Sequence, residues 1–470
     1  MNNKGQITIF LSLIMSVLIF LGFFAVKICK YYNARSRAAQ VVNSAISDVK
    51  SEFNSYIYEH YHILLFDKTD YGKGEAAVEE FLYENIKNNL SDDQKEIFVA
   101  ITDFDLISDN NYEALKSQIN DYSAYAALEN SADTILSKTN GKEAALDKNL
   151  EANMDADIND TSSDSDNEVK SDNNHLGDDN DDPRDFTKTM GKKGILLFVV
   201  PNDMEISNEI IDLSECPTMG RINLAGFYNM NDKFDSYSRL KSDLKQNTSW
   251  NNELINAGCG LAYAREVFNC AVNQNVNEDT VFKFEMEYLI CGRASDYMNL
   301  KSTVKRIISI RFSIDFAYLL TDTSKMSRVK SIAYSLSFAT AIPEPVLKYL
   351  IAGCWAYVEA VSDTRELLKG NKVEFKKTGE NWKTDIDNLE KSFMSDSSEQ
   401  DDGMSYEDYL LILMAVNMDE VYPRMLDIIQ LNTRQFYPSF KISNAAVGLT
   451  VDASIEYEDS VFDFSISGGY

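Results

Sequence analysis

Three histidines, His60, His62 and His175, are all that the 470-residue chain offers for imidazole chemistry. None lies from Gly194 onward, so a histidine-dependent catalytic triad or zinc site there would need His60 or His62 to reach across. Those two residues are two positions apart and would point in different directions on a helix. We therefore interpret the histidines as structural residues.

The six cysteines also lack a spacing that does chemistry. None forms a Cys-x-x-Cys motif, and Cys29 lies just beyond the end of an apolar run, at the expected membrane edge. The other five form an odd set, which is not a disulfide framework for so long a chain. They are expected to be small buried hydrophobic residues: Cys216, Cys259, Cys270, Cys291 and Cys354.

Motifs for phosphate, dinucleotide, serine-hydrolase and metalloprotease chemistry are absent from the sequence. Glu75–Glu84 could supply paired carboxylates, but their spacing fits a solvated helix face. Asp164–Glu168 does not continue as a calcium-binding EF-hand loop. We therefore expect no enzyme, with no catalytic residue, no cofactor and no metal. An enzyme here would need a carboxylate-only or metal-dependent site, marked by buried acids with raised pKa values.

Composition narrows the class of partner. The formal net charge is −29, and no basic patch or stripe of the kind that binds nucleic acid is visible. Apolar residues make up 44% of the chain, which can build a sizeable core. Only seven prolines are present, which favours a helix-rich body.

An uncharged apolar run, Gly5–Val26, opens the chain. As a helix it measures about 33 Å, enough to cross a hydrocarbon core of ~30 Å. A cleavable signal peptide has a shorter apolar stretch and a small-residue cleavage site, whereas Lys27–Tyr32 follows here. We therefore predict a retained transmembrane anchor. Nearby Lys and Arg favour a cytoplasmic body, although long domains translocate largely regardless of such charges.

A helical stripe of apolar residues continues beyond the anchor. No Pro or Gly interrupts Lys27–Tyr71, so one continuous helix of roughly 55–60 residues is predicted. The stripe packs either on its own domain or against copies of the chain, and both readings stay open. Its residues are spaced 4, 4, 3, 4, 4 and 3 apart: Ala34, Ala38, Val42, Ala45, Val49, Phe53 and Tyr56. Contact between copies would use the small residues Ala34, Ala38, Ala39 and Ala45.

Periodicity and turn residues predict the remaining elements. The fold class is α+β and helix-dominated, with a long N-terminal transmembrane-plus-amphipathic helix, a mixed soluble body and a C-terminal β-hairpin packing on the helices. Pro423 should kink the last helix. Strands are expected at 96–107, 195–200 and 279–290, and the hairpin at 446–457 and 460–467. Helices are expected at 75–90, 112–137, 254–272, 296–321, 325–340, about 343–368, and 406–433.

Four segments follow from this pattern. Residues 1–30 form the anchor, and 31–139 form the amphipathic helix with a small α+β region. Residues 140–193 form a disordered linker, because the acidic tract Glu151–Asp185 is too poor in apolar residues to offset its ordering entropy. Residues 194–470 form a larger α+β body.

Six segments of the chain together resemble an uncharacterised, clostridial-type family of membrane-anchored proteins encoded near Tad (Flp) pilus assembly genes. The resemblance implies a TadE/TadG-like pseudopilin role, with the N-terminus in the cytoplasm and the body outside; the family's activity is unknown. The segments are Lys4–Leu13 (KGQITIFLSL), Asn33–Ala39, Tyr61–Asp67, Glu287–Ile307, Tyr406–Met414 and Leu426–Arg434.

Lys4 and Gly5 before the apolar run also resemble a prepilin peptidase site. In pilins a Glu lies five residues after the Gly, whereas this chain has Phe10. The departure puts cleavage and ordinary pilin polymerisation in doubt, so an uncleaved anchor is expected.

The function expected from these observations is that of a single-pass cell-membrane protein with an extracytoplasmic body and a structural or assembly role at a Tad pilus. Its partners would be the membrane, other pilus or secretion components, and copies of itself through the N-terminal helix. The alternative is a ligand-binding or sensory ectodomain. That function would be marked by a deep apolar pocket with convergent polar groups near the second body.

Overall fold

The computed structural model describes residues 4–126, 183–201, 204–207, 210–218, 250–274, 276–277, 280–340, 342–394, 402–458 and 460–470. Its contacts divide the chain into two compact units. The terminal unit comprises Met1–Gln118 and Ile429–Tyr470, and the central unit comprises Ile119–Ile428. The predicted class is confirmed: the fold is α+β and helix-dominated, with a long apolar N-terminal helix and a C-terminal strand pair.

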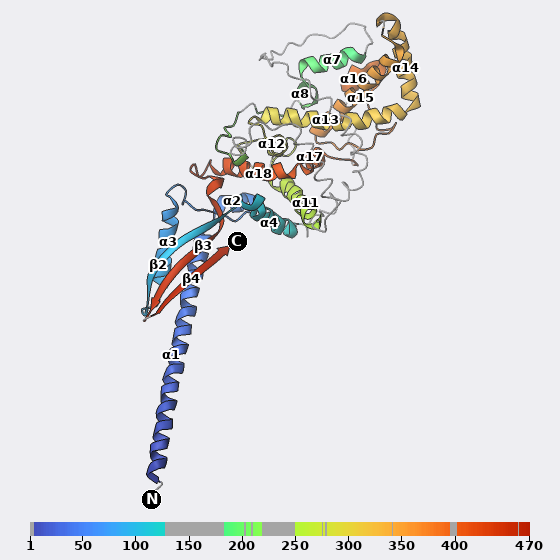
Figure 1. Cartoon of the computed structure of the whole chain (residues 1–470). Helices are drawn as coiled ribbons and strands as arrows, with labels where there is room; N and C mark the ends of the chain where they lie inside the picture. Colours follow the sequence, from blue (N-terminus) through green and yellow to red (C-terminus); the bar gives the residue numbers. More distant parts are fainter. Residues whose placement is uncertain are drawn as a thin grey trace. The chain divides into compact units, whose positions relative to one another are not determined.

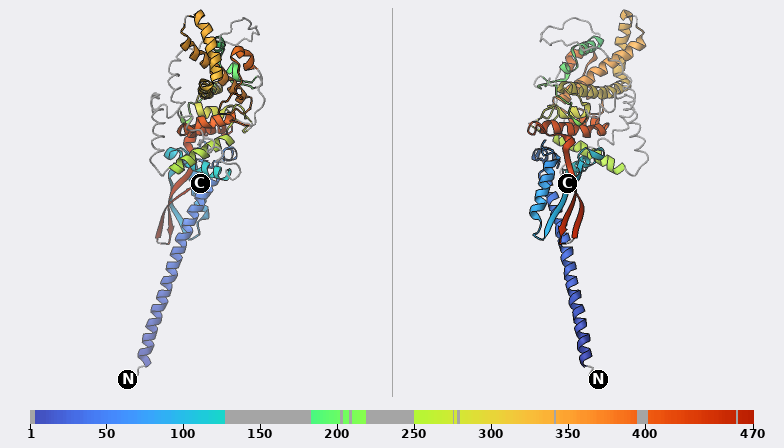
Figure 2. Two further views of the ribbon diagram at one scale, coloured as in Figure 1. Left: turned by 90° about the vertical axis from the view of Figure 1, so that its right-hand side faces the viewer. Right: turned by 60° about the vertical axis from the view of Figure 1, so that its left-hand side comes forward.

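Helix α1 (Lys4–Ser51) has two halves with different surroundings. Every side chain from Phe10 to Lys30 is exposed, and this half extends alone beyond the sheet of its unit (Figures 1 and 2). From Ala34 to Val49 a stripe of side chains is buried, at the predicted helical spacing. Burial thus begins at Ala34, a short distance after the apolar run ends at Val26, so the amphipathic half follows the apolar half.

The prediction of one continuous helix of roughly 55–60 residues is wrong. α1 ends at Ser51, and a separate helix, α2 (Ser55–Tyr61), follows. Asn54 begins α2 because its side-chain oxygen accepts a hydrogen bond from the backbone N–H of Ile57 at 2.9 Å. His62 ends α2 in the left-handed conformation, with φ 55°.

A four-stranded antiparallel sheet forms the body of the terminal unit. Its central strand, β3 (Ala445–Tyr457), pairs with β2 (Gln94–Leu106) on one side. On the other side it pairs with β4 (Ser460–Gly469) and with the two-residue β1 (Phe66–Asp67). The C-terminal hairpin and the strand predicted at 96–107 are therefore confirmed. The first strand of the hairpin, β3, pairs with strands from the N-terminal part of the chain.

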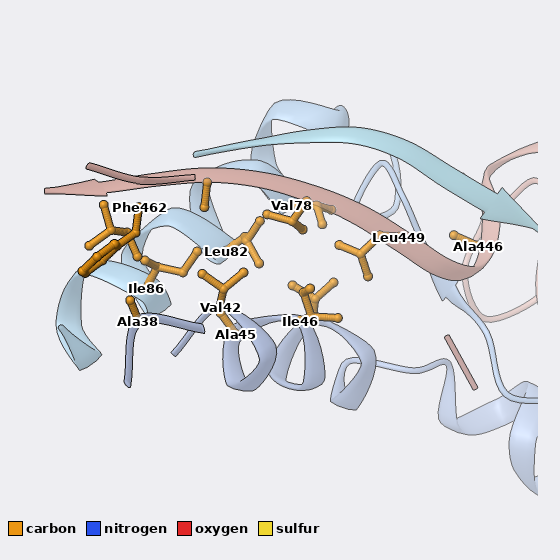
Figure 3. Close-up of a cluster of buried hydrophobic side chains, with 14 of the residues drawn as sticks. Ala38, Val42, Ala45, Ile46, Val78, Leu82, Ile86, Ala446, Leu449 and Phe462 are labelled. Atoms are coloured by element: carbon orange, nitrogen blue, oxygen red, sulfur yellow. The ribbon is translucent and has the colours of Figure 1, made fainter. Parts of the chain in front are cut away.

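The second half of α1, together with α3 (Glu75–Asn89), packs against this sheet and encloses its core (Figure 3). The alanines of α1 let the helix backbone come close to the strands. Of the two readings left open for the stripe, packing on its own domain is observed: Ala34, Ala38 and Ala45 are buried there, whereas Ala39 is partly exposed. The principal core residues are Ala34, Ala38, Val42, Ala45, Ile46 and Val49 of α1, Val78, Leu82 and Ile86 of α3, and Leu449, Val451, Ala453, Ile455 and Phe462 of the hairpin.

Helices build the central unit, and α15 (Glu344–Leu368) lies at its core. α13 (Asp296–Thr321) packs along it, with its predicted bounds confirmed, and α14 (Thr323–Thr340) and α7 (Pro183–Lys193) also contact it. The other helices are α8 (Leu196–Val199), α11 (Trp250–Val267), α12 (Glu285–Cys291), α16 (Leu389–Met394) and α17 (Tyr406–Ala415). Two helices span the boundary between the units: α4 (Asp109–Ala126) and α18 (Met418–Thr433).

Two strand predictions in this unit are wrong. Residues 195–200 contain the short helix α8, since an apolar run of six residues fits a buried helix as well as a strand. The stretch predicted as a strand at 279–290 ends in α12 instead. The predicted helix at 406–433 is divided between Ala415 and Met418, whereas Pro423 lies inside α18.

The predicted segment boundaries also differ from the observed units. Residues 183–193, expected at the end of the linker, form α7, and its Met190 is buried. Residues 429–470, expected in the second body, group with the terminal unit. The rest of the predicted linker at 140–182, including Asp164–Glu168 and His175, lies outside the described residues.

Candidate functional site

The exposed half of α1 is the first candidate site. The most apolar 18-residue window of this helix has a mean hydropathy of 2.4, and none of it is buried. Lys4 and Gly5, the predicted processing site, are the first residues of α1, and the side chain of Phe10 is 65% exposed. A helix this long, apolar and exposed could anchor the chain in a membrane.

A buried ionic cluster in the central unit is the second candidate. Arg311 of α13 is fully buried, and its guanidinium contacts Asp315 one turn along α13 at 3.3 Å. It also donates two hydrogen bonds to Asp363 of α15, that from Nε measuring 3.1 Å. Tyr409 of α17 accepts a further hydrogen bond at 3.2 Å. The cluster therefore joins three helices through one cation.

The loop between α15 and α16 contributes the other cations. Lys377 is 3% exposed, and its ammonium lies 2.8 Å from Asp363 and 2.5 Å from Glu359 of α15. Glu359 also accepts hydrogen bonds from the backbone N–H groups of Lys383 and Thr384, both at 2.8 Å. These contacts fix an otherwise irregular loop onto α15.

The two aspartates of the cluster respond differently to burial. Burial raises the pKa of Asp315, and the nearby Arg311 and Lys377 only partly oppose the rise. Burial also acts to raise the pKa of Asp363, but its cationic neighbours, Arg311 first, bring it below its usual range. The pair therefore favours one ionised carboxylate, Asp363, and one protonated carboxyl, Asp315.

A second set of buried carboxylates binds backbone amides. Glu285 accepts a hydrogen bond from the N–H of Asn269 at 2.9 Å, and Glu287 accepts one from the N–H of Ala271 at 3.0 Å. Asp296, at the start of α13, accepts the N–H of Lys283 at 3.0 Å. These acids satisfy backbone donors in the irregular chain around α12.

Hydrogen bonds join α12 to the last helices of the central unit. Glu287 accepts the hydroxyl of Tyr406 at 2.9 Å, and Tyr288 donates its hydroxyl to Asp427 at 2.7 Å. Burial raises the pKa of Glu287 to about 7 and that of Asp427 to about 6, despite the hydrogen bonds that they accept. These four residues come from three of the segments that carried the family resemblance, which thus meet in one buried network.

The raised pKa values are those that an acid–base catalyst would need, but access to these groups is closed. Asp315, Glu287 and Asp427 are each 0% exposed. A catalytic acid has to come within hydrogen-bond reach of its substrate. As folded here, the acids bind the protein's own amides, hydroxyls and cations.

His60, His62 and the cysteines, all within the described residues, form no cluster of chemically reactive groups. His60 contacts the backbone oxygen of Tyr56 at 2.9 Å and stacks on its ring. All six cysteines are free thiols, of which Cys216 and Cys270 are buried and Cys29 is exposed. Within the described part of the chain, no group of three or more His, Cys, Asp or Glu residues could hold a metal ion.

Two of the hollows on the described surface differ in size and lining. The larger, of about 500 Å³, is open and apolar, at the start of α15, and is lined by Pro345, Val346, Tyr349 and Leu350. The smaller, of about 50 Å³, lies where α1 meets the β3–β4 turn, and its lining is polar and aromatic. Neither is the deep apolar pocket with convergent polar groups that a ligand-binding ectodomain would show.

The sequence profile of one protein family, described as a family of unknown function (DUF5702), matches residues 173–457, more than half of the chain. The chain belongs to this family. The DUF5702 match covers the helices of the central unit and strand β3, and it begins after α1. No curated protein matches the chain, and no solved structure does.

Sequence reasoning missed the ionic cluster, which lies inside the DUF5702 region. A signal was present: Glu359 and Asp363 lie four residues apart in a helix that is otherwise rich in apolar residues. Arg311 and Asp315 show the same spacing in α13. Charges at i and i+4 within a buried helix require partners, although the sequence does not show that Lys377 is one of them.

Proposed function

We propose that the protein is a single-pass membrane protein with a structural or assembly role at a Tad (Flp) type pilus, and that it is not an enzyme. One observation carries the proposal: α1 is exposed and apolar from Phe10 to Val26 and buried against its own sheet from Ala34 to Val49. A helix divided in this way holds a folded unit directly at a bilayer surface.

The resemblance of the N-terminal segments to TadE/TadG-like proteins supports the pilus assignment. A pseudopilin needs an apolar N-terminal helix that can pack in a membrane, continued by a half that is fixed to a folded head. The terminal unit supplies both parts. Its partners would be other pilus or secretion components, with self-association occurring through the exposed half of α1.

The proposed topology places the N-terminus in the cytoplasm and the body outside the cell membrane. Its test is protease treatment of intact, wall-stripped cells that produce the full-length protein. Fragments of the body should be released without detergent, while a cytoplasmic marker protein stays whole. Protection of the body until detergent is added would reject export.

Association with a pilus is tested separately from topology. Cells that assemble the pilus are sheared, and both the filament fraction and the cross-linked membrane fraction are probed for this protein. Recovery with pilus components supports the proposal. Equal recovery from cells that lack the pilus genes would contradict it.

The anchor is proposed to stay uncleaved, because Phe10 occupies the position of the pilin Glu. Intact mass and N-terminal sequencing of the membrane form should show a chain that begins upstream of Gly5. A mature chain that begins after Gly5 would show processing by a prepilin peptidase.

A ligand-binding or sensory ectodomain is the second candidate, and the apolar hollow at the start of α15, although open rather than deep, is the place where it would bind an apolar ligand. Tyr349 and Leu350, which line it, are 55% and 48% exposed. An apolar probe that binds there should lose affinity in Leu350→Gln. Unchanged probe binding in that variant would remove the support for this candidate.

A further inference from the structure

The smaller hollow lies at the level where α1 leaves the membrane, and this inference rests on the proposed anchor. The apolar run ends at Val26, and Lys27 is the first charged residue after it. The polar headgroup layer adds roughly 5–8 Å on each side of the hydrocarbon core. At ~1.5 Å per residue, that layer spans about four or five residues of α1. Residues 27–31 therefore lie among the headgroups.

Three residues of α1 line this hollow on one helix face. Lys27, Lys30 and Tyr31 are separated by three and four positions, so their side chains lie together. Both lysines are exposed, and neither forms an ion pair with a described residue. Lysines at this depth extend their ammonium groups toward lipid phosphates.

The opposite wall comes from the β3–β4 turn, through Tyr457, Glu458 and Ser460. The turn is held in place by aromatic contacts. Phe462 stacks on Tyr457 and contacts the ring of Tyr31 edge-on, with ring centroids 5.1 Å apart. The hollow is thus a fixed feature between two elements of the terminal unit.

The size of the hollow and the charges on its walls indicate which kind of ligand fits. Its volume of about 50 Å³ exceeds the ~10–15 Å³ that one water needs on the same measure, so a group of a few heavy atoms fits. Two lysines attract a phosphate, and Glu458 on the facing wall attracts a cation and repels a second anion. An amine next to a phosphate matches both walls.

We infer that this hollow binds the headgroup of a zwitterionic aminophospholipid, with the phosphate against Lys27 and Lys30 and the amine against Glu458. The ligand is a lipid of the membrane that α1 enters, so binding fixes the height and rotation of the terminal unit at the surface. Tyr31 and Tyr457 suit this layer, where amphipathic aromatic rings gather.

The test is native mass spectrometry of the full-length protein in detergent, supplied with phosphatidylethanolamine, phosphatidylglycerol of the same acyl chains, or inorganic phosphate. The wild type should retain phosphatidylethanolamine most. The double variant Lys27→Gln/Lys30→Gln should lose it by about tenfold or more. Glu458→Gln should abolish the preference over phosphatidylglycerol. The control Lys192→Gln/Lys193→Gln, two exposed lysines of α7, should behave as wild type.

Unchanged lipid retention in the Lys27/Lys30 variant would overturn the inference, and so would a wild-type preference for phosphatidylglycerol or equal binding of inorganic phosphate. Alkaline extraction of membranes separates this failure from failure of the anchor. A protein that stays in the extracted membranes but shows no lysine-dependent lipid binding refutes only the headgroup site. A protein released by alkali refutes the anchor itself.

Discussion

Glu287 gives the sharpest test of the buried network, because its stability effect should depend on pH. The side chain is fully buried, and one of its oxygens accepts the N–H of Ala271 and the hydroxyl of Tyr406. The other oxygen has no hydrogen-bond partner among the described residues. Burial is the main reason that the pKa rises from 4.5 to about 7.

The sign of the effect follows from that rise. Between pH 4.5 and about 7 the unfolded chain releases the proton of Glu287 while the folded protein keeps it. The contribution of Glu287 to stability is therefore largest below pH 4.5, and it is lost as the pH rises toward 7. At about 1.4 kcal/mol per pH unit, the loss totals about 3 kcal/mol as an upper bound.

Glu287→Gln removes the proton equilibrium and keeps the shape of the side chain. Its unfolding free energy relative to wild type should therefore increase by up to about 3 kcal/mol between pH 4.5 and 7.5. Any change in stability that the amide causes equally at all pH values cancels when the two pH values are compared. Urea unfolding of the full-length protein, followed by tryptophan fluorescence, measures the central unit, because Trp250, Trp355 and Trp382 all lie within it.

Glu390→Gln is the matched control, since Glu390 is exposed on α16 and the change removes the same charge. Its stability curve should keep the pH dependence of the wild type. A Glu287→Gln curve that runs parallel to wild type across the whole range would refute the reasoning, because the buried carboxyl would then not retain its proton on folding.

Three further predictions concern packing and the ionic cluster. Arg311→Met should lower the unfolding free energy of the central unit by about 3–5 kcal/mol, because two buried aspartates lose their shared cation; a loss under about 1 kcal/mol in urea unfolding would contradict this. Val42→Asp places a charge in the core under the sheet and should strip β3 of hydrogen-exchange protection, whereas exposed Asn43→Asp should not. Gly468→Ala would bring a Cβ within 2.7 Å of the side chain of Ile46, so the free energy of unfolding should fall by about 1–3 kcal/mol and the melting temperature should fall with it. An unchanged melting temperature would show that Ile46 moves freely.

Sequence patterns predicted the elements whose signals are local. α13 has its predicted bounds, Asp296–Thr321, although the Ser that precedes it forms no capping hydrogen bond through its side chain. The hairpin was predicted because β3 alternates with period two up to a two-residue turn. The helix start at Asn54 was missed, because the apolar stripe continues on either side of it and favoured a single long helix.

Other features depend on contacts distant in sequence. The stretch at 279–290 alternates as a strand would, with Glu285 and Glu287 on the expected solvent side, yet both acids are buried on backbone amides. The pairing of β2 with β3 joins residues at least 340 positions apart, which no local pattern specifies. Lys377 reaches the ionic cluster from an irregular loop, so its role follows only from the fold.

The order in which the ribosome delivers these pieces has a consequence for biogenesis. α1 is made well before β3 and β4, so its apolar half can enter a membrane, as proposed, while these strands are still missing. Until these strands are made, no strand covers the apolar stripe of α1 from Ala34 to Val49, and a chain that stops before Ala445 can never cover it. Truncated chains anchored through α1 should therefore expose an apolar surface. Membrane proteases that degrade incomplete chains should recognise that surface.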